Sequence, residues 1–436
     1  MEGSVDYIRS FKARPCKREG YEGPVMSEQR SRGYLIFLVV FMGLVGQMDV
    51  WLSLIETRAA TLILAEAGLT TTTQWLFGLW QGIFGVIVFL VFFIGYFSDA
   101  FGRRKGILAL MLVMGVPAGL ILFVPSIAFG TIGWFLFIFL YSIVIMGTTS
   151  NLWEVPITEE SPAKRRGLYG SLAFLISVIP LYALLGTPIM EALGWRWGYG
   201  IMAIFMILLL VLLVFMQETR RWTDVQEGRA EKRLGVIEAI KSLGRRDLLY
   251  IGVASLVYLA WTMSFKLGTT WSGVFFATTP YAAQFNTILT IGGLMLPISA
   301  IISGILLEKL GRNLTLIIGT FGAIFSFVGL GFAGLPAFFW GIYFFMAMVL
   351  AWIYVYVTEI FPTPVRSSSV GIAVTASRLG YVLAPLLAAG MFLLFPSDWL
   401  AFWVVAALIM IFPLISFLTK PYETKGKELE TIDKEK

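Results

Sequence analysis

Apolar segments of about 20 residues recur along the chain, and they limit its fold more than any other feature. A helix of that length satisfies its own backbone hydrogen bonds while it crosses a hydrocarbon core of about 30 Å. The composition agrees, because 58% hydrophobic and 14% charged residues depart from the roughly 45–50% and 25% of soluble proteins. The sequence therefore predicts an all-α membrane protein.

Twelve segments are long and apolar enough to be transmembrane helices. An even number of spans places both termini on the same side of the membrane. The predicted spans are residues 34–55, 75–97, 107–125, 131–152, 168–190, 197–216, 248–276, 285–307, 314–333, 336–358, 368–394 and 398–418.

The positions of Lys and Arg predict the orientation, because these residues are retained on the cytoplasmic side. With the N-terminus inside, only Arg58 and Arg196 fall in external connections, and only Lys266 and Arg378 fall within spans. The remaining 29 of the 33 basic residues (33 − 4) lie on the cytoplasmic side. We therefore expect a multi-pass plasma-membrane protein with both termini in the cytoplasm. Its basic loops face anionic lipid headgroups, so the net charge does not require a nucleic-acid partner.

The chain has few of the side chains that catalysis or metal binding uses. It contains no histidine, and its one cysteine, Cys16, lies in the polar segment 1–30, which we interpret as a cytoplasmic tail. We expect no metal site, no cofactor and no enzymatic activity. Without histidine, carboxylates are the groups that remain to carry a proton through the membrane. A nutrient sensor without transport activity stays open, although the linker 218–246 is too short for a sizeable signalling domain.

Three charged segments recur in the same order in the two parts of the chain. Residues 95–105 match 304–312 at an offset of 209 (304 − 95). Glu154 matches Glu359 at 205 (359 − 154), and residues 217–220 match 422–425, also at 205. Six spans separate the copies, so the repeat is parallel. It predicts six-helix halves at 31–217 and 247–419, joined by the linker 218–246 and followed by a cytoplasmic tail at 420–436.

The repeated segments resemble motifs of the major facilitator superfamily. Residues 359–366 and 421–430 are similar to loop motifs of its sugar porter and organic ion branches. The resemblance implies two six-helix halves around a central path, and a monomer that transports a small molecule. The loop after the second span matches the superfamily's signature loop at Gly95, Asp99, Gly102, Arg103 and Arg104.

The resemblance also implies a cytoplasmic gate built from these loops. Asp99 would reach the start of span 11 near Ser367 and Ser368, and Glu308 would play the mirrored part near span 5. The alternative is that these are solvated loop charges. The remaining residues of the expected gate are Glu154 with Arg166, Glu359 with Arg366, and Gly311 and Arg312 in the second signature loop.

Three charged residues fall inside predicted spans, namely Asp49, Lys266 and Arg378. Each costs roughly 2.5 to 3.5 kcal/mol at a helix centre, so each should face a wet cavity or a partner. Asp49 resembles in placement the proton-carrying aspartate of symporters, and the guanidinium of Arg378 suits a substrate carboxylate. Two structural alternatives remain open: an Asp49–Lys266 ion pair, and a Lys266 side chain that extends to the outer surface.

The substrate class is predicted from the same charges. Tyr381, Trp261 and Tyr354 are candidates to line the path, with packing as their alternative role. Sugar porters carry Gln and Asn in spans 5 and 7, whereas residues 170–189 and 255–276 contain neither. Two cations and one carboxylate favour an anion, so we expect proton-coupled symport of a small organic acid. A sugar or other neutral nutrient transporter and a metabolite or drug exporter are the alternatives.

Overall fold

The computed structural model describes residues 30–162, 166–227, 244–361, 366–419 and 421–426, and this part of the chain contains helices and loops but no strand. Eleven helices within it are long and apolar enough to cross a membrane. Ile132–Thr148 is a shorter apolar helix at the position of the fourth predicted span. The predicted all-helical class is confirmed.

The helices fall into two groups along the chain, which we call the first and second halves. The first half contains α2 (Arg32–Leu54), α3 (Glu56–Glu66), α4 (Trp75–Phe84), η1 (Gly85–Leu90), α5 (Val91–Phe101), α6 (Arg103–Leu120), η2 (Ile121–Phe123), α7 (Ile132–Thr148), α8 (Glu154–Glu160), α9 (Arg166–Val178), η4 (Ile179–Leu185), α10 (Gly186–Leu193), α11 (Trp195–Leu213) and α12 (Arg220–Gln226). The second half contains α14 (Arg245–Ala277), η5 (Ala282–Gln284), α15 (Phe285–Lys309), α16 (Arg312–Ala333), α17 (Pro336–Glu359), α18 (Arg366–Arg378), α19 (Gly380–Leu394), α20 (Trp399–Ile409), α21 (Phe412–Ile415) and η6 (Ser416–Thr419).

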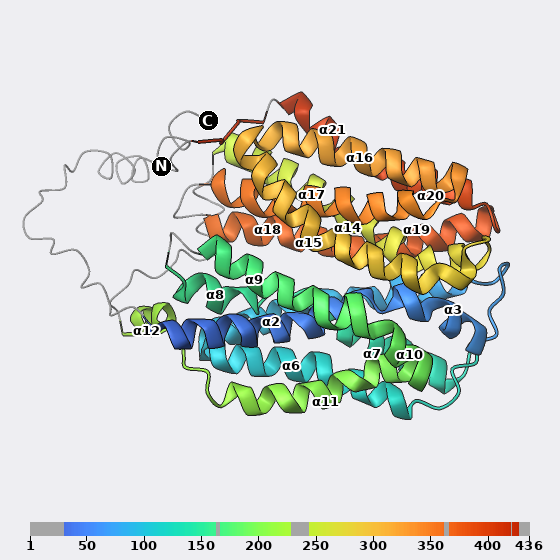
Figure 1. The fold of residues 1–436 in the computed structure, drawn as a ribbon, viewed down its shortest axis with the longest axis horizontal. Coiled ribbons are helices and arrows are strands. Elements are labelled where there is room, and N and C mark those ends of the chain that lie inside the picture. The colour runs from blue at the N-terminus through green and yellow to red at the C-terminus, as the bar shows by residue number, and fades with distance from the viewer. Residues whose placement is uncertain (1–29, 163–165, 228–243, 362–365, 420, 427–436) are drawn as a thin grey trace, which may run out of the picture.

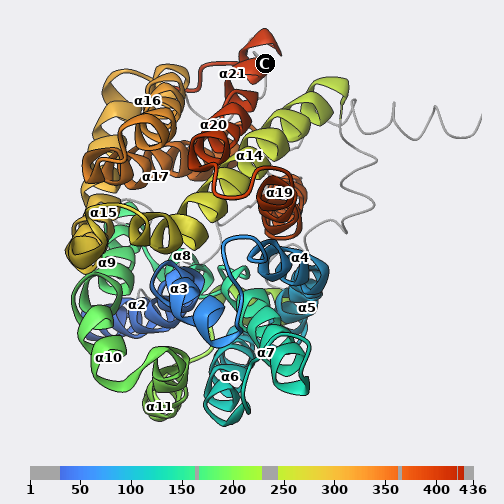
Figure 2. The same cartoon turned by 90° about the vertical axis from the view of Figure 1, so that its right-hand side faces the viewer.

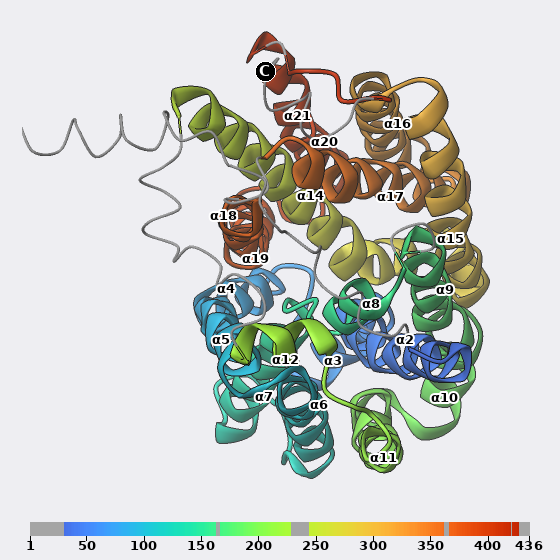
Figure 3. The same cartoon turned by 90° about the vertical axis from the view of Figure 1, so that its left-hand side faces the viewer.

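The long helices run side by side along the long axis, with the first half in the lower layer and the second half in the upper layer of Figure 1. The described chain starts and finishes at the same end, which we call the terminal end; it carries the starts of α2, α6 and α16. The opposite end, with Glu66 and Arg196, is the distal end. Figure 3 views the terminal end and shows α12 lying across the ends of the first-half helices.

The first span continues further than the sequence predicted. Helix α3 follows α2 after Ile55, which itself has helical dihedral angles. Glu56, Thr57 and Arg58 are therefore buried in the bundle. The prediction that Arg58 lies in an external connection is wrong, because its partner group, the Tyr182 carbonyl, lies inside the bundle.

The two halves pack together most extensively through three pairs of elements: α4 along α19, α3 along α14, and η4 along α15. Figure 2 shows the first two pairs at the distal end. Gly78, Gly82 and Gly85 line the α4–η1 face toward α19, and a Cβ at Gly78 would lie 2.7 Å from the Pro385 carbonyl oxygen. These small residues permit the close helix approach typical of membrane bundles.

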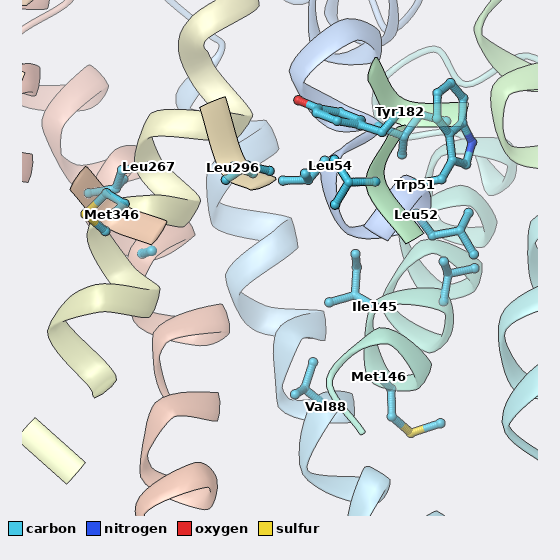
Figure 4. Close-up of a cluster of buried hydrophobic side chains, with 14 of the residues drawn as sticks. Trp51, Leu52, Leu54, Val88, Ile145, Met146, Tyr182, Leu267, Leu296 and Met346 are labelled. Carbon is cyan, nitrogen blue, oxygen red and sulfur yellow. The ribbon is translucent and has the colours of Figure 1, made fainter. Parts of the chain in front are cut away.

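A buried apolar cluster extends across the contact between the halves. Figure 4 shows Leu54 of α2 and Leu296 of α15 facing each other, with Trp51 and Tyr182 on the first-half side. Trp51 is fully buried, and its ring leaves no room for a Cβ at Gly186. Packing of this density orders the helices around the charged groups described below.

Each half carries the same polar network at the terminal end. In the first half, the Glu218 carboxylate accepts hydrogen bonds from the backbone N–H groups of Arg103 (2.7 Å) and Arg104 (3.3 Å) at the start of α6. In the second half, Glu423 accepts from Arg312 and Asn313, each at 2.9 Å, at the start of α16. A carboxylate at a helix N-terminus satisfies free N–H groups and the helix dipole.

The side chains complete the repeat and correct one sequence match. Arg103 pairs with Glu159 at 2.9 Å, and Arg312 pairs with Glu359 at 2.7 Å. Glu159, not Glu154, is therefore the counterpart of Glu359. The match at Glu154 was wrong because α8 inserts more than one helical turn between the two acids.

The terminal networks join elements of one half each, which differs from the interhalf gate that the resemblance implied. Asp99 forms an ion pair with Arg103, and its side chain is 70% exposed. Glu308 is also exposed. The side chains of Arg166, Arg366, Ser367 and Ser368 lie outside the described residues.

We predict that Gly102→Ala destabilises the protein. Gly102 has φ +111°, and an added Cβ would lie 2.3 Å from Glu218 Oε2. With ψ 154° this is a conformation that almost only glycine adopts, and it costs a residue with a side chain about 1–3 kcal/mol; the Glu218 cap would be displaced as well. Gly95→Ala is the matched control, since nothing lies within 4 Å of its Cβ position. Thermal unfolding of the purified variants tests this, and equal melting temperatures would contradict it.

Candidate functional site

The three predicted membrane charges lie at two depths. Gly380 of α19 packs against Thr262 of α14, so these two residues are level. Lys266 is four residues beyond Thr262 and Arg378 is two residues before Gly380, so Lys266 lies about 9 Å nearer the distal end than Arg378 at 1.5 Å per residue. Asp49 is seven residues before Glu56, the partner of Lys266, which places Asp49 about 10 Å nearer the terminal end than that pair. The structure therefore divides the predicted site into a central and a distal part.

Asp49 is buried and held by neutral donors. Trp153 Nε1 donates to Asp49 Oδ2 at 2.9 Å, and Ser53 Oγ donates to Oδ1 at 3.1 Å. Glu154 follows Trp153 directly and begins the short helix α8, so a second carboxyl group lies close to Asp49.

Lys266 pairs with Glu56 and not with Asp49. The Lys266 ammonium forms an ion pair with Glu56 across the two halves and also donates to the Tyr141 hydroxyl at 3.1 Å. Thr270 Oγ1 donates to Glu56 Oε2 at 2.8 Å, and Gln81 Nε2 donates to Oε1. Both alternatives from the sequence are therefore wrong: Lys266 has no ion pair with Asp49, and it is buried rather than extended to the outer surface.

Arg378 bridges the halves at the central depth. Its Nη2 donates to the Thr149 carbonyl at 3.2 Å, and Nη1 lies 3.5 Å from Thr375 Oγ1. Its Nε is buried and has no hydrogen-bond partner among the described residues. No carboxylate pairs with Arg378 within that part of the chain. A guanidinium in this state retains donors for an anion.

The candidate aromatic residues have different surroundings. Tyr381 lies near Lys266, whose Nζ is 6.0 Å from the centre of the Tyr381 ring. Tyr354 is 40% exposed, and its hydroxyl accepts from Asn151 Nδ2 of the first half at 3.5 Å. Trp261 donates to the Met346 carbonyl at 2.7 Å and stacks on Phe265. Trp261 therefore packs within its own half, whereas Tyr354 and Tyr381 face the contact between the halves.

A small pocket adjoins the distal ion pair. It is lined by Gln81, Tyr141, Ser142, Lys266 and Tyr381, together with Gly85, Val88, Ile145 and Pro385. Its walls come from α4, η1 and α7 of the first half and from α14 and α19 of the second. Among the described residues, no group of three or more acidic residues or cysteines is placed to hold a metal ion.

A second polar contact between the halves also escaped the sequence analysis, and it runs through Tyr182 of the π-helical segment η4. Within the first half, Arg58 Nη2 donates to the Tyr182 carbonyl at 2.8 Å. The Tyr182 hydroxyl lies 2.8 Å from the Tyr343 hydroxyl of α17. The only available signal was that Glu56 and Arg58 follow the first span directly, which we interpreted as the start of a loop.

We predict that Glu56 and Lys266 are energetically coupled. Lys266→Met leaves the buried Glu56 carboxylate without its counter-charge, and Glu56→Gln leaves the buried Lys266 ammonium without one. Each variant should therefore lose about 3–5 kcal/mol of stability. The double variant removes both charges and should recover most of that loss. Thermal unfolding of the purified variants measures the cycle. The control pair Asp49→Asn with Lys266→Met should show no recovery, and recovery there would contradict the assignment.

Known proteins resemble the chain over most of its length. The chain is 24% identical to the probable metabolite transport protein CsbC of Bacillus subtilis over 78% of the chain and 81% of the relative. It is 24% identical to the glucose transporter GlcP of Staphylococcus epidermidis over 78% and 84%. The shikimate transporter of Escherichia coli is 25% identical over 74% and 78%.

The fold matches solved structures as well. A partially occluded, inward-open structure of the xylose transporter XylE from Escherichia coli superimposes with a TM-score of 0.69, at 18% identity, over 91% of this chain and all of that one. The sequence model of the Major Facilitator Superfamily matches residues 35–356 and 282–436. With its apolar helices and its paired terminal networks, the chain belongs to the Major Facilitator Superfamily.

Proposed function

We propose that this protein carries a small organic acid together with a proton across the plasma membrane. In this proposal, twelve helices form two halves, 31–217 and 247–419, which alternate around the central site. The linker 218–246 and both termini lie in the cytoplasm, so the terminal end is the cytoplasmic end. The transporter works as a monomer.

The proposal of an anionic substrate rests on Arg378, which has no carboxylate partner among the described residues. It lies at the central depth, it contacts both halves, and its buried Nε has no hydrogen-bond partner in the described part of the chain. A half-buried cation within the bundle that lacks a carboxylate partner is costly, and a substrate carboxylate would remove that cost. A neutral substrate would not.

Asp49 supplies the coupling in this proposal. Its donors, Trp153 and Ser53, are neutral, so protonation of Asp49 does not leave a buried cation without its partner. When Asp49 is neutral, the carrier can enclose it in a low-dielectric interior at little cost while it changes conformation; enclosing an ionised Asp49 is costly. Asp49 would take its proton from outside and release it to the cytoplasm, with Glu154 as its neighbour.

A sugar or another neutral nutrient is the second candidate, and it is favoured by the likeness to GlcP and XylE. Export of a metabolite or drug would use the same fold. Proteoliposomes that contain the purified protein distinguish these cases. Radiolabelled carboxylates and sugars would be tested with and without an inside-alkaline pH gradient. Accumulation of a sugar, and of no carboxylate, would overturn the proposal.

We predict that Asp49→Asn separates exchange from accumulation. Asparagine imitates the protonated aspartate, so the variant should still exchange labelled for unlabelled substrate. Accumulation driven by a pH gradient should be lost. Asp398→Asn is the matched control, because Asp398 is an exposed helix cap at the distal end. If Asp49→Asn accumulates substrate as well as the control does, Asp49 is not the coupling residue, and Glu154 is the next carboxylate to test.

We predict that Arg378→Lys raises the apparent substrate constant about tenfold, and that Arg378→Ala raises it further. Lysine retains the charge but loses the planar fork, and hydrogen bonds to charged groups contribute about 1.5–3 kcal/mol. Arg196→Lys is the control, since Arg196 pairs with Glu66 at the distal end. Unchanged constants in both Arg378 variants would show that Arg378 does not bind the substrate.

A further inference from the structure

We infer that Lys266 and Thr270 form a second carboxylate-binding site, at the distal depth, which Glu56 fills with its own carboxylate in this structure. The transported acid would bind there when the distal end is open, and Glu56 would replace it when the distal end closes. This inference rests on the proposed alternating access.

The contacts of Glu56 define the site. Its two oxygens accept hydrogen bonds from Lys266 Nζ, Thr270 Oγ1 and Gln81 Nε2, and the residue is 1% exposed. Lys266 and Thr270 are four residues apart on α14, so their donors point to the same side of that helix. A cation with two neutral donors around two oxygens is a donor set that suits a carboxylate.

The site divides between the halves along the surface where they meet. Glu56 lies on α3 and Gln81 on α4, whereas Lys266 and Thr270 lie on α14. Separation of α3 from α14 therefore removes Glu56 but leaves the ammonium and the hydroxyl together. The exposed Lys266 would then lack a counter-charge, which an incoming carboxylate supplies.

The pocket beside Lys266 marks where the rest of the ligand would lie; in this structure it has room for about one water molecule, so the ligand requires the halves to separate. Lys266 and Tyr381 both line it, and Tyr381 is one helical turn beyond Arg378 in the sequence. An acid displaced by Glu56 thus finds the second cation, Arg378, at the central depth, about 9 Å nearer the terminal end. Distal closure and substrate release from the distal site are the same event in this arrangement.

The inference predicts that removal of the internal competitor increases carboxylate binding. Purified Glu56→Gln would be titrated in detergent with sodium lactate, pyruvate, benzoate and succinate, against sodium chloride at equal ionic strength. Stabilisation against heat reports binding. At least one of these acids should bind about tenfold tighter than to the wild type, because a tethered competitor acts at a high effective concentration.

Variants of the donors identify the site. Adding Lys266→Met to Glu56→Gln should abolish the gain, and adding Thr270→Val should reduce it. Thr269→Val is the matched control: Thr269 is equally buried, but its hydroxyl donates to the Phe265 carbonyl. Glu56→Asp retains the charge on a shorter side chain and should show a smaller gain, which keeps the test valid if Glu56→Gln does not fold.

Two results would overturn the inference. One is a Glu56 variant that folds but binds none of the four acids more tightly than the wild type, since Glu56 would then only hold the halves together. The other is a gain that survives Lys266→Met. Neither depends on flux, so failure of carboxylate transport in proteoliposomes would remove the proposed function separately.

Discussion

The ion pair between Glu56 and Lys266 joins the halves inside the bundle, about 15 Å from the distal end, and the contact between the halves on that side depends on it. Both charges are buried, so each requires the other in a low-dielectric interior. The pair can form only while α3 lies against α14. The close packing of α4 along α19 likewise requires the two halves to be in contact. The electrostatic and packing terms therefore stabilise the same distal contact.

The terminal end is built on a different principle. Its two networks each tie a helix start, an arginine and two glutamates within one half. Gly102 and Gly311 make this possible, since each has a positive φ that brings the chain onto a glutamate cap. Each half is thereby cross-linked to itself at this end. An interhalf ion pair on the distal side and internal pairing at the terminal end suit two bodies that rock against each other.

Between these ends, the buried Asp49 and the half-buried Arg378 are charges with neutral partners. Asp49 accepts from an indole and a hydroxyl, and Arg378 donates to a backbone carbonyl. Such partners orient a charge without neutralising it. These groups therefore retain the capacity to bind a proton and an anion, whereas the saturated pair of Glu56 and Lys266 must first be opened.

The sequence by itself determined the helical class, the apolar spans, the repeat apart from its match at Glu154, and three of the charges inside the bundle. These follow from local properties: the length of apolar runs, the cost of a charge in lipid, and the spacing of repeated motifs. It did not determine which charges meet. Glu56 and Lys266 are 210 residues apart, and α8 shifts the register so that Glu159 takes the place expected for Glu154. Those partnerships are long-range, and only the packing of one half on the other decided them.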